Sequence, residues 1–375
     1  MKIVYFSPID WDFLKQRPQH IAEELSKDHT VYFIEPSISI VKSIIYKKNF
    51  HKSREFNVNA NLKVIRPSGK FRLPKIFDLV DFAGINLAYE KKILMKLIEE
   101  SDLIWVGSPI YYGLVRDIRN KNIVYDKMDD YGQLTKSILL RKLIETNEKG
   151  LLSKASLIFT SSKFLFDKIN GIGKPVVLVR NGLDESICLN KDLGSNKVSD
   201  ELKRIKENGS VIFGYIGTID HWFDYDAIQH ILEHRKNNKV IIVGHNKLPI
   251  YNHENVYYFD AVPKNELGSI INEFDYCLYT FKKNALLDSI DPVKIYEYLG
   301  FNKKVIAVKS AETIRFKKQI KLYSNDIGLE KVLNELDCIK APFNSDELKK
   351  FINDNVWYER VLSMIEHMNA HKILK

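Results

Sequence analysis

Short apolar runs alternate with segments of helical pattern along most of the chain, and this alternation restricts the possible folds more than any other feature. The first run covers residues 3–7, a helical segment follows at 17–27, and the second run covers 31–35. Runs of this kind are typical of strands that are buried on both faces of a parallel sheet. The alternation therefore predicts an α/β fold with parallel sheets.

A polar stretch divides the alternation into two series. The chain has 375 residues, which is too many for one ordinary core. Residues 188–208 are rich in Lys, Asp, Ser, Asn and Gly, and a second series of strands begins at Val211. We therefore predict two Rossmann-like domains joined by a linker. The expected boundaries are a first domain at 1–185, a linker at 186–209, a second domain at 210–354, and a C-terminal helix at 355–375 whose return to the first domain is left open.

The composition is that of a soluble globular protein, with 45% hydrophobic and 28% charged residues. No run of about 18 apolar residues is present, so no segment is expected to span a bilayer. Residues 2–6 lead directly into a strand without a secretory h-region. The three cysteines are far apart and have no metal-binding or redox spacing, which fits a reducing compartment. We expect a cytoplasmic protein, with a peripheral position on the inner face of the plasma membrane left open.

The net charge of +9 is concentrated in one part of the chain. Between Lys42 and Lys75 the sequence has ten Lys or Arg and one acid, Glu55, whereas the rest of the chain is balanced. A uniformly basic chain would suggest a nucleic-acid partner, but one local patch suggests a single docking surface. Aromatic and aliphatic residues are interleaved with these charges, a mixture that suits the headgroups of an anionic membrane. An ordinary solvated loop is the alternative.

The segment 291–300 carries the strongest indication of a binding site. Pro292 suits the first turn of a helix, where its missing N–H group costs nothing. Lys294 and Glu297 are three residues apart and project from one face near the start of that helix. A helix N-terminus with a lysine attracts phosphate, and a carboxylate one turn later can accept hydrogen bonds from a ribose diol. The alternative is a surface Lys–Glu pair, and the residues described next favour a nucleotide-sugar site.

Glycine follows two strands of the predicted second domain. Gly217 and Thr218 end the first of these strands, and Gly244 ends the second. A glycine lets the backbone approach a phosphate closely, and ligands of open α/β sheets bind at the carboxyl ends of strands. The spacing differs from the full dinucleotide fingerprint, so tight strand-to-helix turns are the alternative.

Carboxylates gather after a strand of the predicted first domain. Asp126, Asp129 and Asp130 follow the run at 123–125. Carboxylates at the carboxyl end of a strand suit general-base chemistry, but each can equally cap the next helix. Base and cap stay open for Asp129 and Asp130, and a base is less expected of Asp126. Such acids can also hold Mg²⁺. No phosphate-loop lysine motif accompanies them, so we expect no metal.

The loop after the first strand offers candidates for binding a second substrate. Asp10 and Trp11 lie in this loop, and Arg17 and His20 lie at the entry of the helix that follows. Loops between a strand and the next helix occupy the ligand-binding edge of such sheets. A lone His is more often structural than catalytic, and that alternative stays open for His20.

Taken together, these residues resemble glycosyltransferases of the two-Rossmann-domain (GT-B) fold. Five features match the pattern of the family 4 group and its relatives. They are the segments Thr160–Ser162, Arg180–Asp184, Gly214–Gly217, Val262–Leu267 and Pro292–Leu299. The Arg-Pro-Gln-His segment at 17–20 and the segment 125–130 are similar to enzymes of teichuronic-acid and exopolysaccharide assembly. The resemblance covers nearly the whole chain, and Pro292–Leu299 is its most specific part.

The resemblance implies two domains that face each other across a cleft, with the acceptor on the first and the donor on the second. It implies that Glu297 holds the ribose, that Lys294 holds the diphosphate, and that Gly217 lies against the phosphates. Retaining enzymes of family 4 usually carry a second acid eight residues before that Glu, where this chain has Ser289 beside Asp288.

That departure puts a retaining reaction in doubt. The inverting xanthan glucuronosyltransferase group uses an Asp of the first domain as its base, a role that Asp129 or Asp130 would fit. The leading expectation is therefore a metal-independent enzyme without a cofactor. It would move a sugar, most simply from UDP, to a lipid-linked or saccharide acceptor of a surface polysaccharide. A nucleotide-sugar epimerase and a noncatalytic nucleotide-sugar-binding protein are the alternatives.

Overall fold

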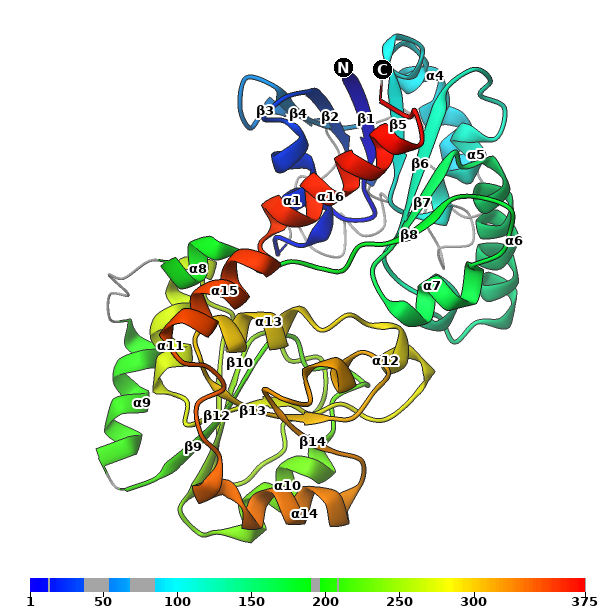
Figure 1. The fold of residues 1–375 in the computed structure, drawn as a ribbon. Coiled ribbons are helices and arrows are strands. Elements are labelled where there is room, and N and C mark those ends of the chain that lie inside the picture. The colour runs from blue at the N-terminus through cyan, green and yellow to red at the C-terminus, as the bar shows by residue number, and fades with distance from the viewer. Residues whose placement is uncertain (13, 37–53, 68–84, 190–195, 208, 375) are drawn as a thin grey trace. The chain divides into compact units, whose positions relative to one another are not determined.

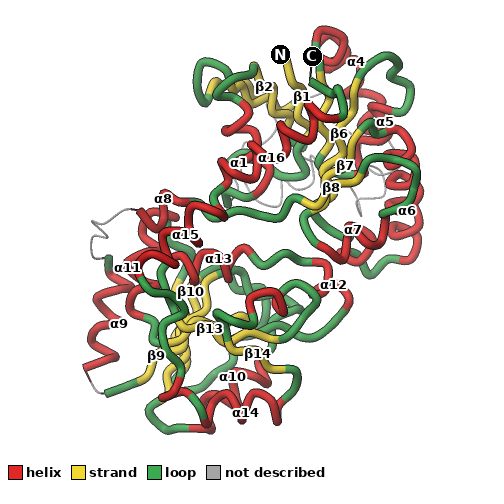
Figure 2. The backbone as a smooth tube through the Cα atoms, in the orientation of Figure 1, coloured by secondary structure: helices red, strands yellow, loops and turns green. Residues whose placement is uncertain are grey.

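The protein consists of two compact α/β units in a computed structural model. The structure describes all residues except 13, 37–53, 68–84, 190–195, 208 and 375. The first unit comprises residues 1–180 and 360–375, and the second comprises 181–359 (Figure 1). In both units the strands form one central sheet with helices around it (Figure 2).

The first unit is built on an eight-stranded sheet with the order β3-β4-β2-β1-β5-β6-β7-β8. All neighbouring strands are parallel except the antiparallel pair β3 and β4. The strand order runs in opposite directions on the two sides of β1, so β1 and β5 border the switch point where ligands of such sheets bind. The strands are β1 (Lys2–Phe6), β2 (Thr30–Ile34), β3 (Arg54–Asn57), β4 (Leu62–Arg66), β5 (Leu103–Val106), β6 (Asn122–Lys127), β7 (Leu157–Thr160) and β8 (Val176–Leu178).

The central strands of this sheet are buried because helices cover both of its faces. β5 and β7 have no exposed residue, as expected of strands that read as continuous apolar runs. The described helices of the unit are α1 (Arg17–Leu25), α4 (Ile85–Glu100), η1 (Pro109–Tyr111), α5 (Tyr112–Val115), η2 (Tyr131–Leu134), α6 (Ile138–Lys154), α7 (Lys163–Ile169) and α16 (Trp357–Ala370). A capping box at Gln16 and the proline at position 18 begin α1 where the sequence predicts a helix.

The C-terminal segment belongs to the first unit. Val361, Met364 and Met368 of α16 are buried at helical spacing, and the Asn122 side chain donates a hydrogen bond to the carbonyl of Ile373 (3.0 Å). Since α16 begins at Trp357, this helix carries the chain from the second unit back to the first.

The second unit is built on a six-stranded parallel sheet with the order β11-β10-β9-β12-β13-β14. Its strands are β9 (Val211–Ile216), β10 (Asn238–Val243), β11 (Val256–Phe259), β12 (Tyr276–Tyr279), β13 (Lys304–Val308) and β14 (Lys321–Tyr323). The described helices are α8 (Glu185–Leu189), α9 (Lys197–Glu207), α10 (Tyr225–His234), η3 (Lys264–Glu266), α11 (Leu267–Glu273), α12 (Ala285–Ser289), α13 (Val293–Gly300), η4 (Thr313–Phe316), α14 (Asp326–Asn334), η5 (Leu336–Cys338) and α15 (Ser345–Asn355).

One expected boundary needs correction. Residues 186–209 were predicted as a linker, but their described part contains most of α8 and all of α9, and both helices belong to the second unit. Leu202 and Ile205 of α9 are buried in the core of that unit, so this polar stretch is an amphipathic helix. The division between the units falls at Arg180 and Asn181 instead. Within the described residues, no helix is both long enough and apolar enough to cross a bilayer.

Candidate functional site

Two glycines form the end of the central strands in the second unit. Gly217 follows β9 and Gly244 follows β10, and both have φ near +145°, a region that side chains rarely adopt. A Cβ atom on Gly244 would lie 2.4 Å from the carbonyl oxygen of Gly217, and one on Gly217 would lie 2.3 Å from Cε of Lys294. Only glycine fits at either position. The two glycines therefore bring Lys294 directly against the backbone at the sheet edge.

The start of α13 is fixed by a buried acid beside it. Asp291 accepts a hydrogen bond from the backbone N–H of Asn181 (2.7 Å), and the Asn181 side chain donates to the Asp291 carbonyl (3.1 Å). Arg315 pairs with the Asp291 carboxylate, which also accepts from the Tyr296 hydroxyl (3.3 Å). Pro292 is the buried N-cap residue that follows. These contacts hold the first turn of α13, and thus Lys294, in one place.

Lys294 and Glu297 are charged, partly buried and unpaired. Neither side chain forms a hydrogen bond or an ion pair with any residue that the structure describes, although Lys294 Nζ lies 5.7 Å from the centre of the Tyr215 ring. Burial lowers the pKa of Lys294, and the nearby Glu297 opposes this shift. Burial raises the pKa of Glu297, and Lys264 and Lys294 oppose it. Unpaired charges away from water are costly, so these two groups are poised for a ligand.

Lys264 and Asp184 lie near Glu297 and are paired with each other. Their ion pair has a length of 2.8 Å, and both side chains are mostly buried. Lys264 favours the charged form of Glu297 and Asp184 disfavours it. Both residues belong to segments that the sequence singled out, but neither was predicted at the site. Their position in the motifs at 180–184 and 262–267 could have indicated them.

The remaining positions of this site are less constrained. Thr218 follows Gly217, and its carbonyl accepts a hydrogen bond from the Tyr215 hydroxyl (3.1 Å). Ser289 is buried and donates to the Leu286 carbonyl (2.7 Å). The Asp288 carboxylate accepts from the backbone N–H of Ala311 (2.9 Å). Ser289 therefore does not replace the second acid of family 4, and Asp288 is engaged by the backbone.

The three aspartates after β6 differ in the partners of their side chains. Asp126 is fully buried and forms a two-point ion pair with Arg17. Asp130 pairs with Lys168 (2.7 Å). The carboxylate of Asp129 has no hydrogen bond or ion pair to the described residues. Burial, reinforced by Asp126 and Asp130 and opposed by Lys127 and Arg17, raises the pKa of Asp129 to about 6.

These partners separate Asp129 from its neighbours. A general base at neutral pH needs a pKa near the working pH and an accessible proton-accepting oxygen. Asp129 meets the first condition, because burial raises its pKa to about 6, and its carboxylate has no partner among the described residues. Asp130 is committed to Lys168, so its side chain serves the structure of the loop. The choice between base and cap stays a prediction for both residues, and the structure distinguishes them by the partner of each carboxylate.

Arg17 has a structural role that the sequence did not indicate. It was predicted to bind an acceptor, but only 4% of its side chain is exposed. Its guanidinium donates to both oxygens of Asp126 and to the carbonyls of Val179 (2.9 Å) and Arg180 (3.2 Å). Arg17 therefore fixes the end of β6 to the segment after β8. His20 is also buried, in the first turns of α1.

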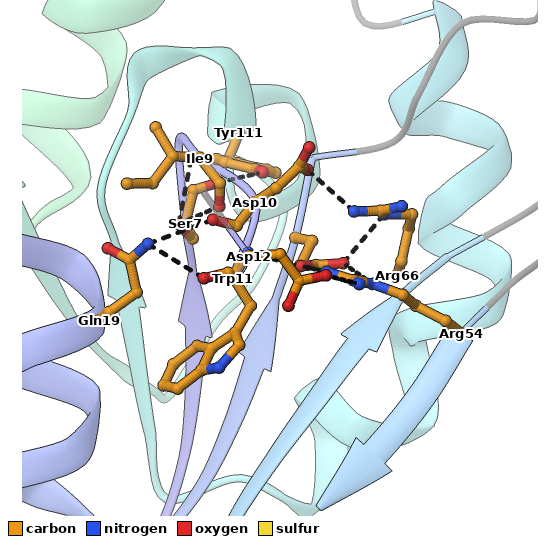
Figure 3. Close-up of polar contacts among 10 residues, drawn as sticks. Ser7, Ile9, Asp10, Trp11, Asp12, Gln19, Arg54, Arg66 and Tyr111 are labelled. Atoms are coloured by element: carbon orange, nitrogen blue, oxygen red, sulfur yellow. Dashed lines mark hydrogen bonds and ion pairs between the residues drawn. The ribbon is translucent and has the colours of Figure 1, made fainter. Parts of the chain in front are cut away.

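Asp10 and Trp11 lie at the carboxyl end of β1, beside the switch point (Figure 3). Asp10 pairs with Arg66 (3.3 Å), and the backbone N–H of Trp11 donates to Glu35 (2.6 Å). Figure 3 shows Asp10 and Asp12 turned toward Arg66 and Arg54, with the Trp11 ring pointing away from them. That ring packs edge-on against Phe33 at 4.9 Å.

Glu35 organises this loop and was not predicted to have a role. It is 1% exposed and pairs with both Arg54 and Arg66. Arg54 and Arg66 belong to the basic stretch 42–75, and a third member, Lys63, pairs with Glu55. The described basic residues of that stretch are thus neutralised by acids within the unit. The other seven lie outside the described residues. No group of three or more His, Cys, Asp or Glu among the described residues is arranged to hold a metal ion.

Comparison with known proteins supports the fold. No family model and no curated protein sequence matches the chain. Solved structures match over almost their whole length. A sucrose-phosphate synthase from Thermosynechococcus elongatus superposes with a TM-score of 0.70 at 11% identity, covering 98% of each chain. HepE from Anabaena, solved with UDP and glucose, has a TM-score of 0.67 at 13% identity and covers 99% of this chain and 100% of its own.

A third match is a UDP-forming α,α-trehalose-phosphate synthase from Burkholderia xenovorans, solved with glucose-6-phosphate. Its TM-score is 0.67 at 9% identity, and the match covers 98% of this chain and 99% of that one. At such low identities the likeness establishes the fold alone. The chain has the GT-B fold of these glycosyltransferases, and the predicted fold class is confirmed.

Proposed function

We propose that this chain is a glycosyltransferase that takes a sugar from a nucleoside-diphosphate sugar, with UDP as the nucleotide. The observation that carries the proposal is the pair Lys294 and Glu297, both partly buried and without a described partner, with Lys294 against Gly217. A cation against a glycine backbone suits a diphosphate, and a carboxylate one turn away suits a ribose diol. The Anabaena and Burkholderia proteins support this proposal, since the first was solved with UDP and the second is a UDP-forming synthase.

In this proposal Asp129 acts as the base of an inverting displacement. It removes the proton from the acceptor hydroxyl while that oxygen attacks the anomeric carbon, and the bond to the diphosphate breaks. Lys294 stabilises the departing diphosphate, so the reaction needs no metal. The support is twofold: Asp129 has a raised pKa and a free carboxylate, and the second unit offers no unengaged acid at 288 or 289.

The acceptor in this proposal is a lipid-linked or saccharide acceptor of a surface polysaccharide, bound on the first unit near Asp10 and Trp11. The enzyme works in the cytoplasm, where the basic stretch 42–75 approaches an anionic membrane. The interleaved charges and apolar residues of that stretch support the last point. The pairing of Arg54, Lys63 and Arg66 reduces the charge that it can offer.

Titration calorimetry with UDP and with uridine tests the donor site. Glu297→Ala should weaken both ligands by about 1–3 kcal/mol, the scale of a lost charged hydrogen bond. Lys294→Met should weaken UDP by a similar amount and leave uridine almost unchanged, because its proposed partner is phosphate. Lys303→Met is the matched control, since Lys303 donates to the carbonyls of Asn272 and Phe274 away from the site.

A donor panel then separates the enzymatic alternatives. The proposal expects release of UDP to depend on an added acceptor. Interconversion of UDP-sugars without an acceptor would indicate an epimerase. Tight binding of UDP-sugars without turnover for any acceptor tested would indicate a binding protein. Equal loss of UDP and uridine affinity in Lys294→Met would contradict the assigned role of that residue.

A further inference from the structure

Three large apolar side chains are exposed together at the junction of η2 and α6. Leu134 is the last residue of η2, and Ile138 and Leu139 are the first two of α6. Their exposed fractions are 53%, 72% and 64%. Side chains of a helix lean toward its N-terminus, so Ile138 and Leu139 extend toward the loop that carries Leu134. We call these three residues the apolar tip.

The shape of the apolar tip is fixed by hydrogen bonds. The Arg141 guanidinium donates to the carbonyls of Gly132 and Thr135, both at 3.1 Å, and so fastens the residues on either side of Leu134 to α6. The Ser137 hydroxyl caps the helix by accepting from the N–H of Leu140 (3.3 Å). The loop is therefore held in one conformation, and Leu134 is displayed by it.

The inward positions of this region are already occupied. Leu140 and Ile144 pack against Tyr131 in a small buried cluster, with Met128 beside them. Leu140 and Ile144 are four residues apart and form the inner face of α6. Ile138 and Leu139 consequently lie on other faces of the helix and have no core to enter. Single exposed apolar residues are ordinary, but three at one fixed tip are a feature that calls for a partner.

The charged residues within the segment that carries the apolar tip are all basic. Lys136 and Lys142 are exposed beside it, and residues 131–144 contain no acid. The first acid after the tip is Glu145, about two turns into α6, and its side chain lies beside Gly132 at the base of the loop. Apolar side chains surrounded by lysines match the surface of an anionic bilayer, where the lysines meet headgroups and the apolar groups enter the layer beneath. A stable protein interface needs roughly 20–30 residues on each side, far more than this tip offers.

We propose that the apolar tip inserts into an anionic membrane surface and is the principal membrane contact of the first unit. This surface differs from the basic stretch 42–75. It consists of residues that hydrogen bonds from Arg141 and Ser137 hold in place, and the charged residues at 131–144 are all basic.

The location of the tip bears on the acceptor, a step that rests on the proposed function. Leu134 is five residues from Asp129, a span of at most about 18 Å even for an extended chain. With the tip in a bilayer, the proposed base lies close to the headgroup layer. A hydroxyl carried by a lipid-linked acceptor would be held at that depth, whereas a soluble saccharide would gain nothing from it. The acceptor class is therefore a lipid-linked sugar or lipid phosphate.

Vesicle sedimentation tests the membrane contact. The full chain is mixed with vesicles of phosphatidylcholine alone or with added phosphatidylglycerol. We expect binding only to the anionic vesicles. The triple variant Leu134→Ser, Ile138→Ser and Leu139→Ser should lose at least about a hundredfold in partitioning, because each buried aliphatic side chain is worth roughly a factor of ten. The matched control is Ile250→Ser with Ile327→Ser, two residues of the second unit that are 65% and 70% exposed.

The outcomes separate this inference from its rivals. Unchanged binding of the triple variant, with loss in Lys47→Gln and Lys48→Gln, would overturn it in favour of the basic stretch. Absence of wild-type binding to anionic vesicles would also overturn it. So would a wild-type dimer in sedimentation velocity that the triple variant abolishes. UDP affinity, measured in parallel, should stay unchanged in the triple variant, so failure of the donor-site proposal remains distinguishable from failure of this one.

Discussion

Lys294 in the second unit is partly buried and Arg17 in the first unit is almost fully buried, yet the partners of the two side chains differ completely. The Arg17 guanidinium donates hydrogen bonds to the two oxygens of Asp126 and to two backbone carbonyls. Lys294 and the nearby Glu297 have neither hydrogen bonds nor ion pairs within the described part of the chain. Both residues were predicted to bind a substrate, Lys294 from the most specific motif and Arg17 from the start of a helix.

The difference shows how to tell a structural charge from a ligand-binding one. A buried ion pair whose hydrogen bonds are complete has no capacity left for a substrate, and removing one partner leaves the other stranded. An unpaired, partly buried charge costs stability in the free protein and recovers it when a ligand arrives. Asp129 and Asp130 show the same contrast in two adjacent residues. Asp130 pairs with Lys168, whereas the Asp129 carboxylate has no partner among the described residues.

The largest expected effect concerns this pair of aspartates. Asp129→Asn should lower turnover by about 10²–10⁴ and leave UDP affinity nearly unchanged, because a base acts only in the chemical step. The acid limb of kcat/KM in the wild type should lie near the raised pKa of Asp129, about 6, and should vanish in the variant.

Asp130→Asn is the matched control for that variant. It removes the charge that pairs with Lys168 and should reduce stability more than turnover. Steady-state kinetics over pH 5–8 with the best donor and acceptor measure both variants. Near-normal turnover in Asp129→Asn would assign this residue a capping or structural role and break the contrast between the two.

Two substitutions of a cation by methionine sharpen the main comparison. Arg17→Met should destabilise the protein by about 3–5 kcal/mol, since it leaves Asp126 buried without a partner. Lys294→Met should leave stability unchanged or raise it slightly, because it removes a charge that burial disfavours. Urea unfolding of both variants in the absence of nucleotide measures the difference. Equal destabilisation by the two would mean that Lys294 also has a structural partner.

The sequence predicted the parts of this molecule that depend on local pattern. Buried strands such as β5 and the start of α13 at Pro292 follow from apolar runs and helix signals near one another in the chain. The amphipathic helix α9 was missed because its polar composition obscured the spacing of Leu202 and Ile205. The polar composition therefore led to the prediction of a linker, where a helix packs against the core of the second unit.

The setting of each charged residue was harder to predict, because pairing joins residues far apart in sequence. Arg17 and Asp126 are 109 residues apart, and Glu35 meets Arg54 and Arg66 through strand order. Sequence reasoning could list Arg17, Asp129 and Lys294 as candidates, but only the fold shows which of them has a partner. Glu35 gave no signal at all, since a single acid at the end of a strand is common.

A smaller effect on stability should accompany the loss of activity in Asp129→Asn. Its pKa is raised in the folded protein from 3.8 to about 6, so the folded state holds its proton more tightly than the unfolded chain. The ionised group therefore opposes folding, and stability falls as pH rises from about 4 to 6. At pH 7 the Asn variant should be more stable by about 1–3 kcal/mol. Thermal unfolding at pH 7 and pH 4 tests this, because the gain should disappear at the lower pH. A loss of stability at pH 7 would show that the carboxylate has a favourable partner.

The smallest expected effect is the pH dependence of nucleoside binding. Burial raises the pKa of Glu297, with Lys264 and Lys294 holding it down. Its carboxylate form is needed to accept hydrogen bonds from ribose, so affinity should fall as pH decreases through this raised pKa, at a higher pH than an ordinary glutamate would show.

Uridine is the suitable ligand because it carries no phosphate to titrate alongside the protein. Lys264→Met should move the midpoint to still higher pH, since it removes a charge that favours the ionised form, whereas Glu297→Gln should flatten the profile. Calorimetry of uridine binding from pH 4.5 to 8 measures all three proteins. A wild-type profile that stays flat over this range would mean that Glu297 stays charged in the free protein. Its charge would then be stabilised by the protein itself, as that of Arg17 is in the first unit.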